Sequence, residues 1–160
     1  MASSIRMPKF GMIQSTGCAP MVQAYERGQR VATPVENPQT VIATLATGNP
    51  GRAYELLYDY VQDYGGSFVS ATDEEAFNAI RLLARYEGLS VEPATGVTFA
   101  GLIKMVQMGL IDPDEVVVVN CSGHTMPVEK RILGNEWQNS STCPTLRPRP
   151  PCRKRRSRWR

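Results

Sequence analysis

The sequence predicts an α/β protein with a mostly parallel sheet, and three observations support this prediction. Segments with strand character alternate with segments of helical spacing along most of the chain. Val116–Val119 are four consecutive β-branched residues, a run typical of a strand buried on both faces. The segment 95–108 is apolar nearly all round, which predicts a helix that is buried rather than half exposed.

The elements of the N-terminal part are defined by short apolar runs and by their ends. Residues 9–15 include Phe10, Met12 and Ile13 and predict a short strand. Residues 19–28 predict a helix that has a proline in its first turn and a glycine at its end. The polar segment that follows contains two prolines and is expected to be a loop.

The middle of the chain predicts two further helices with a strand between them. Helical spacing of apolar residues predicts the first helix over 51–64, and a short strand is expected over 67–70. Thr72 and Glu75 have the spacing of a capping box, which predicts the start of a helix over 73–87. The buried helix over 95–108 follows, and a last short helix is expected over 127–133.

A polar cluster follows the valine run and is a candidate ligand site. Residues 120–125 read NCSGHT, so five of the six carry a side chain that can hydrogen-bond or coordinate. In open α/β sheets, ligands bind beyond the carboxyl ends of the strands. The alternative is an ordinary exit from a strand into a loop, where such residues are common. The pattern by itself favours this alternative.

The charge of the chain is unevenly distributed. Residues 139–160 carry eight Lys and Arg with no acidic residue, whereas residues 1–138 carry 10 basic and 15 acidic residues. We therefore expect a structured segment over 1–138 and a disordered, basic, Pro/Arg-rich tail over 139–160. The tail is either a nucleic-acid or targeting patch or a non-native extension. The abrupt change of composition after Trp137 favours an extension, and nucleic-acid binding is not expected.

Four segments resemble one enzyme family and occur in that family's order. VEPATGVTFAGLIKMVQMGLIDPDEVVVVNCSGHT resembles the C-terminal part of threonine synthase and its relatives. These enzymes belong to the pyridoxal-phosphate-dependent fold type II group, which includes the tryptophan synthase β chain. The other three segments are MIQSTGCAPMVQAYERG, IATLATGNPGRAYELL and ATDEEAFNAIRLLARYEGLSVEPATG. The resemblance covers residues 7–137.

The resemblance implies a fold, a cofactor and three site residues. The fold would be part of the three-layer αβα sheet of the family's large domain, and the cofactor pyridoxal 5′-phosphate. The hydroxyl of Ser122 would hydrogen-bond the pyridine nitrogen, and Gly123 would let the backbone pass close to the flat ring. Glu92 matches the family's E-P-A turn near the cofactor. Its side chain would either hydrogen-bond a residue that contacts the cofactor, or lie at the start of a helix, where a negative charge interacts favourably with the helix dipole.

The sequence does not match the segments that carry out catalysis in the family's enzymes. The lysine that binds the cofactor covalently and the glycine-rich loop for its phosphate lie N-terminal to the resemblance. Lys9, Lys104, Lys130 and Lys154 do not match that lysine's context, so no catalytic residue is assigned. The chain is therefore expected to be a C-terminal fragment that is inactive alone.

The activity implied for the whole enzyme is conversion of O-phosphohomoserine to threonine and phosphate, so the partner is a small amino-acid substrate. The alternatives are another β-replacement or dehydratase activity of the group, or a non-catalytic binding module that uses the basic tail. The resemblance is also compatible with a homodimeric full-length enzyme.

Metal binding and membrane insertion are not expected. Cys121 and His124 have the spacing of a metal pair, but zinc needs four ligands and the other cysteines are distant. The same pair resembles a thiol and a base, although the family resemblance accounts for both residues without nucleophilic catalysis. No apolar run approaches the length of a membrane span, and the N-terminus has no signal-peptide core, so the expected location is the cytoplasm.

Overall fold

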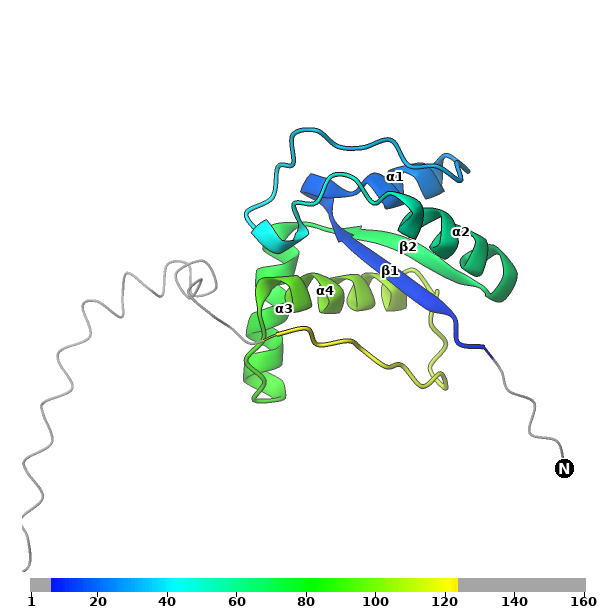
Figure 1. The fold of residues 1–160 in the computed structure, drawn as a ribbon. Helices are drawn as coiled ribbons and strands as arrows, with labels where there is room; N and C mark the ends of the chain where they lie inside the picture. The colour runs from blue at the N-terminus through cyan, green and yellow to red at the C-terminus, as the bar shows by residue number, and fades with distance from the viewer. Residues whose placement is uncertain (1–6, 124–160) are drawn as a thin grey trace, which may run out of the picture.

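The computed structural model describes residues 7–123, and Figure 1 shows their arrangement. The elements are β1 (Phe10–Ser15), η1 (Thr16–Cys18), α1 (Pro20–Glu26), η2 (Ala43–Leu45), α2 (Arg52–Tyr64), β2 (Gly66–Ala71), α3 (Asp73–Tyr86) and α4 (Pro93–Gln107). The four predicted helices and the strands predicted over 9–15 and 67–70 are confirmed, whereas the strand predicted at Val116–Val119 is not. The helix expected over 127–133 and the tail over 139–160 lie outside the described residues.

The two strands of the described part form a parallel pair with helices on both sides. Phe10 is aligned with Gly66 at one end and Ser15 with Ala71 at the other. Figure 1 shows α1 and α2 on one side of the pair and α3 and α4 on the other. This three-layer arrangement confirms the predicted α/β class.

Each face of the sheet has its own apolar core, because successive side chains of a strand point to opposite faces. On one face Met12 packs with Phe68 and with residues of α1 and α2, including the fully buried Tyr54. On the other face Ile13 packs with Ala71 and with residues of α3 and α4. Strands covered on both faces are typical of parallel sheets.

Helix α4 packs closely against both β1 and α3 through two glycines. A Cβ atom added at Gly101 would lie 2.3 Å from Cγ1 of Ile13. One added at Gly96 would lie 2.7 Å from Cγ1 of Ile80 on α3. Any side chain at these two positions would push the helix away from its neighbours, so both glycines fix how closely the layers approach.

The start of α3 carries the predicted capping box. The Glu75 amide donates to the Thr72 hydroxyl at 3.1 Å, and the Thr72 amide donates to the Glu75 carboxylate at 2.7 Å. Lys104 of α4 forms an ion pair with the same carboxylate at 2.7 Å. Burial acts to raise the pKa of Glu75, but the hydrogen bonds from Lys104 and Thr72 and the nearby charge outweigh it, so the pKa lies below its ordinary value.

The valine run departs from its prediction. Val116–Val119, called the valine segment below, forms no strand in the described structure, and the exposed fractions of Val116 and Val118 are 94% and 91%. A strand needs a neighbouring strand to bond its backbone, and β1 and β2 pair only with each other among residues 7–123. The prediction of a buried strand is therefore wrong for this structure.

Helix α4 is also less buried than predicted. One side is fully covered, but Val106 is 54% exposed and Ile103 is 39% exposed. A helix that is apolar all round requires cover on every side. The described residues supply that cover only toward β1, β2 and α3, so the outer apolar residues of α4 face solvent.

Candidate functional site

The three residues predicted to bind the cofactor meet at the N-terminal end of α4. Glu92 is the N-cap residue of this helix, and Pro93 occupies its first turn. The chain leaves the far end of α4, runs back along it, and returns to Glu92 through residues 121–123 (Figure 1). The backbone amide of Glu92 donates to the carbonyl oxygen of Gly123 at 3.0 Å, which joins the two segments.

The hydroxyl of Ser122 is held by two side chains of this helix end. Its Oγ donates a hydrogen bond to Oε1 of Glu92 at 2.8 Å and lies 3.2 Å from Oγ1 of Thr95. The Ser122 amide donates to the same Thr95 oxygen at 3.1 Å. Two interpretations were left open for Glu92. The hydrogen bond from Ser122 fits the first, a hydrogen-bonding partner, and the N-cap position fits the second, a residue at the start of a helix.

Thr95 is a site residue that the sequence reasoning missed. It is fully buried, and both its bonds to Ser122 connect α4 to the returning segment. The available signal was its position three residues after Glu92, which places both side chains on the same side of the first helical turn.

Gly123 makes the close approach to Glu92 possible. A Cβ atom at this position would lie 2.8 Å from the carboxyl carbon of Glu92 and 3.0 Å from Oε1. A side chain here would compete with Ser122 for the same carboxylate. The glycine therefore permits the Ser122–Glu92 contact, whereas the sequence-based expectation gave it only a role toward the ring.

The hydrogen bonds determine what the Ser122 hydroxyl can still do. A serine hydroxyl has one proton and two acceptor positions. Since the proton goes to Glu92, the Thr95 hydroxyl is the donor in the contact with Ser122, and one acceptor position of Oγ is left. Ser122 is exposed, so a ligand atom can reach this position.

The two described lysines both have acidic partners. Lys9 pairs with Glu115 at 2.8 Å. Lys104, expected within a buried helix, is partly exposed, pairs with Glu75 and donates to the Ser70 carbonyl at 3.0 Å. Lys130 and Lys154 lie outside the described residues.

The two described cysteines lie in different environments. Cys121 is exposed and Cys18 is buried, and desolvation raises the pKa of the Cys18 thiol. Within residues 7–123, no three His, Cys, Asp or Glu side chains are grouped so that they could hold a metal ion. His124, the second member of the proposed pair, lies outside this range.

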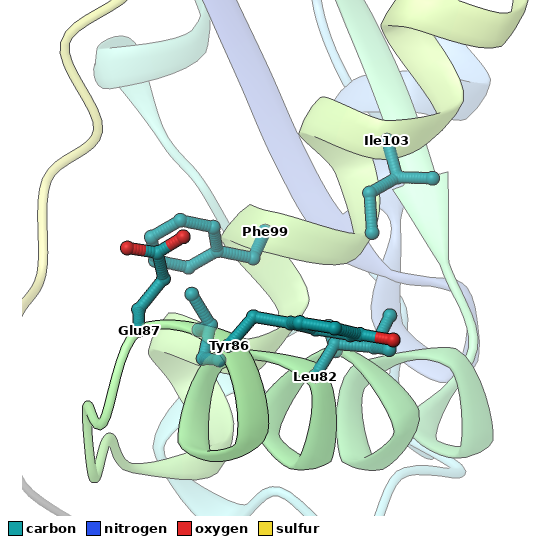
Figure 2. A pocket seen from close by; sticks show the side chains of 7 residues that line it. Leu82, Tyr86, Glu87, Phe99 and Ile103 are labelled. Carbon is teal, nitrogen blue, oxygen red and sulfur yellow. The ribbon is translucent and has the colours of Figure 1, made fainter.

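Two surface hollows lie away from Ser122. The one in Figure 2, about 190 Å³, is bordered by apolar side chains of α3 and α4 such as Leu82, Tyr86 and Phe99. The other, about 380 Å³, lies along β2 beside Lys104. Neither is lined by Ser122, Gly123 or Glu92. No helix of the described range is long and apolar enough to span a membrane.

The chain is similar in sequence to a known enzyme family. Residues 2–123 match the family described as pyridoxal-phosphate dependent enzyme. Threonine synthase of Methanosarcina acetivorans is 43% identical over 127 residues, which are 79% of this chain and 31% of that protein. Threonine synthase of Methanocaldococcus jannaschii is 40% identical over 118 residues, or 74% and 29% of the two chains. The chain spans about a third of the length of these relatives.

Solved structures share the fold at lower sequence identity. Maize serine racemase aligns with a TM-score of 0.61 at 17% identity, over 84% of this chain and 39% of that one. Threonine deaminase isoform 2 from Solanum lycopersicum aligns with a TM-score of 0.62 at 20% identity, over 82% and 35%. The described α/β layers therefore reproduce part of the fold of these enzymes.

Proposed function

This chain belongs to the pyridoxal-phosphate-dependent enzyme family, and from that premise we propose that it supplies the pyridine-nitrogen side of the cofactor site in an enzyme of threonine synthase type. The observation that carries the proposal is the Ser122 hydroxyl, fixed between Glu92 and Thr95 and open to a ligand. The threonine synthases among the relatives support O-phosphohomoserine as the substrate, with threonine and phosphate as products.

The residues present fit the edge of a pyridine ring. Ser122 offers a neutral hydroxyl with a remaining acceptor position, and Gly123 adds no side chain beside it. When bound, the cofactor supplies an electron-withdrawing ring to the substrate's α-carbon. The chain's own residues would hold that ring by its nitrogen edge and limit its orientation.

Glu92 determines whether the Ser122 hydroxyl donates a hydrogen bond to a ligand or accepts one from it. As long as Glu92 accepts the hydroxyl proton, Ser122 faces a ligand with a lone pair, which suits a protonated ring nitrogen. A bond to an unprotonated nitrogen requires Ser122 to turn its proton away from Glu92. The site therefore couples the protonation of the ring nitrogen to the Ser122–Glu92 bond.

The proposed role covers one part of an active site. Covalent capture of the cofactor requires an amine directed at its aldehyde carbon, on a different edge of the ring. Lys9 and Lys104 are held by Glu115 and Glu75. We therefore place the capturing lysine outside residues 7–123, in another part of the same polypeptide or in a partner.

The runner-up is a different reaction on the same cofactor, such as a dehydratase or another β-replacement. The serine racemase and threonine deaminase structures are 17% and 20% identical to this chain, so they show the fold alone. No described contact favours this activity over that of the threonine synthases.

A nuclear magnetic resonance titration of the whole chain tests the proposal without any partner. Pyridoxal phosphate should shift the amide resonances of residues 92, 94, 95 and 121–123, with a dissociation constant well above about 1 mM. One hydroxyl contact contributes only about 1 kcal/mol, whereas micromolar binding needs about 8 kcal/mol.

The matched variants are Ser122→Ala, which should abolish the shifts, and Ser67→Ala, a half-buried serine on β2 that should leave them unchanged. Shifts that survive Ser122→Ala, or that gather around Lys104 instead, would contradict the proposed site.

A further inference from the structure

The valine segment combines an apolar strand sequence with an uncovered position. Its exposed fractions alternate along the chain, at 94% for Val116, 45% for Val117 and 91% for Val118, while Val119 is less than half exposed. Alternation with a period of two is the signature of an extended backbone. The segment therefore has the side-chain pattern of a strand, with one apolar face turned to solvent.

The segment is fixed at both ends. Just before it, Glu115 forms an ion pair with Lys9, the residue that precedes β1, at 2.8 Å. Just after it, Ser122 and Gly123 bond to the start of α4. Figure 1 shows the chain between these points running in the same direction as β1. A tethered, extended segment loses little conformational entropy when a strand pairs with it.

Exposure of this kind identifies an interaction surface. Four valines are the sequence of a strand buried on both faces, yet two of them are almost fully exposed. Both described strands also have an outer edge to which no strand of residues 7–123 is bonded. Unpaired edges and exposed β-branched runs bind other strands readily.

We propose that the valine segment is a docking strand, and that its occupant is a parallel strand of the part of a fold type II polypeptide that this chain does not match. This inference rests on the proposed function, because it identifies the partner that completes the cofactor site. The size of the partner follows from the comparisons, since the threonine synthases extend over about three times the matched length. Pairing would bury Val116 and Val118 and bond the amides of the segment.

A second copy of this chain fits the surface less well. The described parts of two copies carry like charge, since residues 7–123 hold 7 basic and 13 acidic residues. The outer edge of β2 is also partly blocked, because Lys104 donates to the Ser70 carbonyl beside it. An inward-pointing charge of this kind discourages pairing between sheet edges.

The test uses the whole chain and a threonine synthase polypeptide of Methanosarcina acetivorans from which the matched segment has been removed. The probe is first co-expressed with its own excised segment, and only a probe that reassembles with this segment is used. We expect this chain to form a one-to-one complex with the probe, measured by light scattering. In the complex, hydrogen exchange of the amides of residues 116–119 should be slowed tenfold or more, by rough estimate, relative to the chain alone.

Two variants separate the valine segment from general apolar contact. The double variant Val116→Lys and Val118→Lys should weaken the complex by about tenfold or more, since it replaces apolar surface that pairing would bury. Val31→Lys changes another exposed valine, 64% exposed and outside the segment, and should leave the affinity unchanged. Because all three side chains face solvent, each variant should keep the melting temperature of the chain.

Three results would overturn the inference. In the first, this chain does not assemble with the validated probe. In the second, the double lysine variant binds the probe as tightly as the parent chain does. In the third, the chain self-associates and the double variant abolishes this self-association. The last would assign the surface to a second copy. None of these results depends on cofactor binding, so a failure here is distinct from a failure of the titration at Ser122.

Discussion

Ser122, Glu92 and Thr95 form one hydrogen-bonded group at the start of α4. Thr95 is fully buried and gives up both its hydrogen-bonding roles to Ser122, so it fixes the backbone and the hydroxyl together. Glu92 then sets the direction of the Ser122 proton. The use of this group in cofactor binding stays a prediction, although the structure brings together Ser122, Gly123 and Glu92, the three residues predicted from the sequence.

Replacing Gly123 by alanine should disturb this arrangement without unfolding the chain. The added methyl group would lie 2.8 Å from the Glu92 carboxyl carbon, and that flexible side chain can move away at little cost. We expect a change of less than about 0.5 kcal/mol in the free energy of unfolding. The Ser122–Glu92 bond should be lost, which the amide resonances of residues 121–123 would report.

A matched control is Gly109→Ala, where no atom lies within 4 Å of the added Cβ and the local strain is far from the site. If Gly123→Ala leaves the resonances of Ser122 and Glu92 unchanged, the glycine does not serve the contact.

Among the elements, α4 combines close packing on one side with exposure on the other. Gly101 lies against Ile13 of β1, and Gly96 lies against Ile80 of α3, while Val106 faces solvent. The position of Glu92 and Thr95 depends on this packing, since both belong to the first turn of the helix or its cap.

Gly101→Ala should therefore destabilise the protein by about 1–3 kcal/mol, because overpacking forces neighbouring side chains and backbone to shift. The added Cβ would lie 2.3 Å and 2.5 Å from Cγ1 and Cγ2 of Ile13, a branched side chain that has little freedom to move. Chemical denaturation measures the change. Val106→Ala on the exposed side of α4 serves as the comparison and should stay within about 0.5 kcal/mol of the parent chain.

The capping box of α3 predicts a pH dependence. Thr72→Ala should cost about 1 kcal/mol of stability, whereas Thr72→Ser should keep the cap. The pKa of Glu75 is lower in the folded chain than its ordinary value, so the Glu75 carboxylate stabilises the fold above the unfolded-state pKa of about 4.3.

As the pH falls through the lower, folded-state pKa, this contribution is lost. Glu75→Gln should therefore flatten the stability profile in the acidic range. Denaturation midpoints measured between pH 3 and 7 would show the effect, and identical profiles for the variant and the parent would exclude it.

For the molecule as a whole, the main fact is that the chain spans about a third of the length of its threonine synthase relatives. We predict that this chain alone neither captures pyridoxal phosphate covalently nor makes threonine. The reason is that the two described lysines are engaged by Glu115 and Glu75, and the contact proposed for Ser122 reaches only the ring nitrogen.

Mixing the chain with the cofactor, reducing with borohydride and mapping the peptides measures this directly. A stoichiometric adduct at Lys104 or Lys130 would refute it. In the complex with the Methanosarcina acetivorans probe, cofactor binding should return, and Ser122→Asp should lower turnover because a carboxylate can only accept from the ring nitrogen, whereas the Ser122 hydroxyl can also turn to donate to it.

Local sequence determined most of the elements of this protein. Neighbouring residues alone locate these helices and strands. The signals are glycines at helix ends, the proline in the first turn of α1 and the Thr72–Glu75 capping box, each of which spans only a few residues. The family's ordered motifs likewise predicted Ser122, Gly123 and Glu92 as candidate cofactor-binding residues, because matching a motif requires no three-dimensional structure.

Only the tertiary structure decided what those residues touch. The partnership of Ser122 with Glu92 and with the unpredicted Thr95 joins positions 27 or 30 residues apart, and no local pattern encodes such a distance. The valine segment shows the converse. Its composition specifies a strand, but a strand forms only where another backbone supplies hydrogen bonds, and the described chain supplies none there.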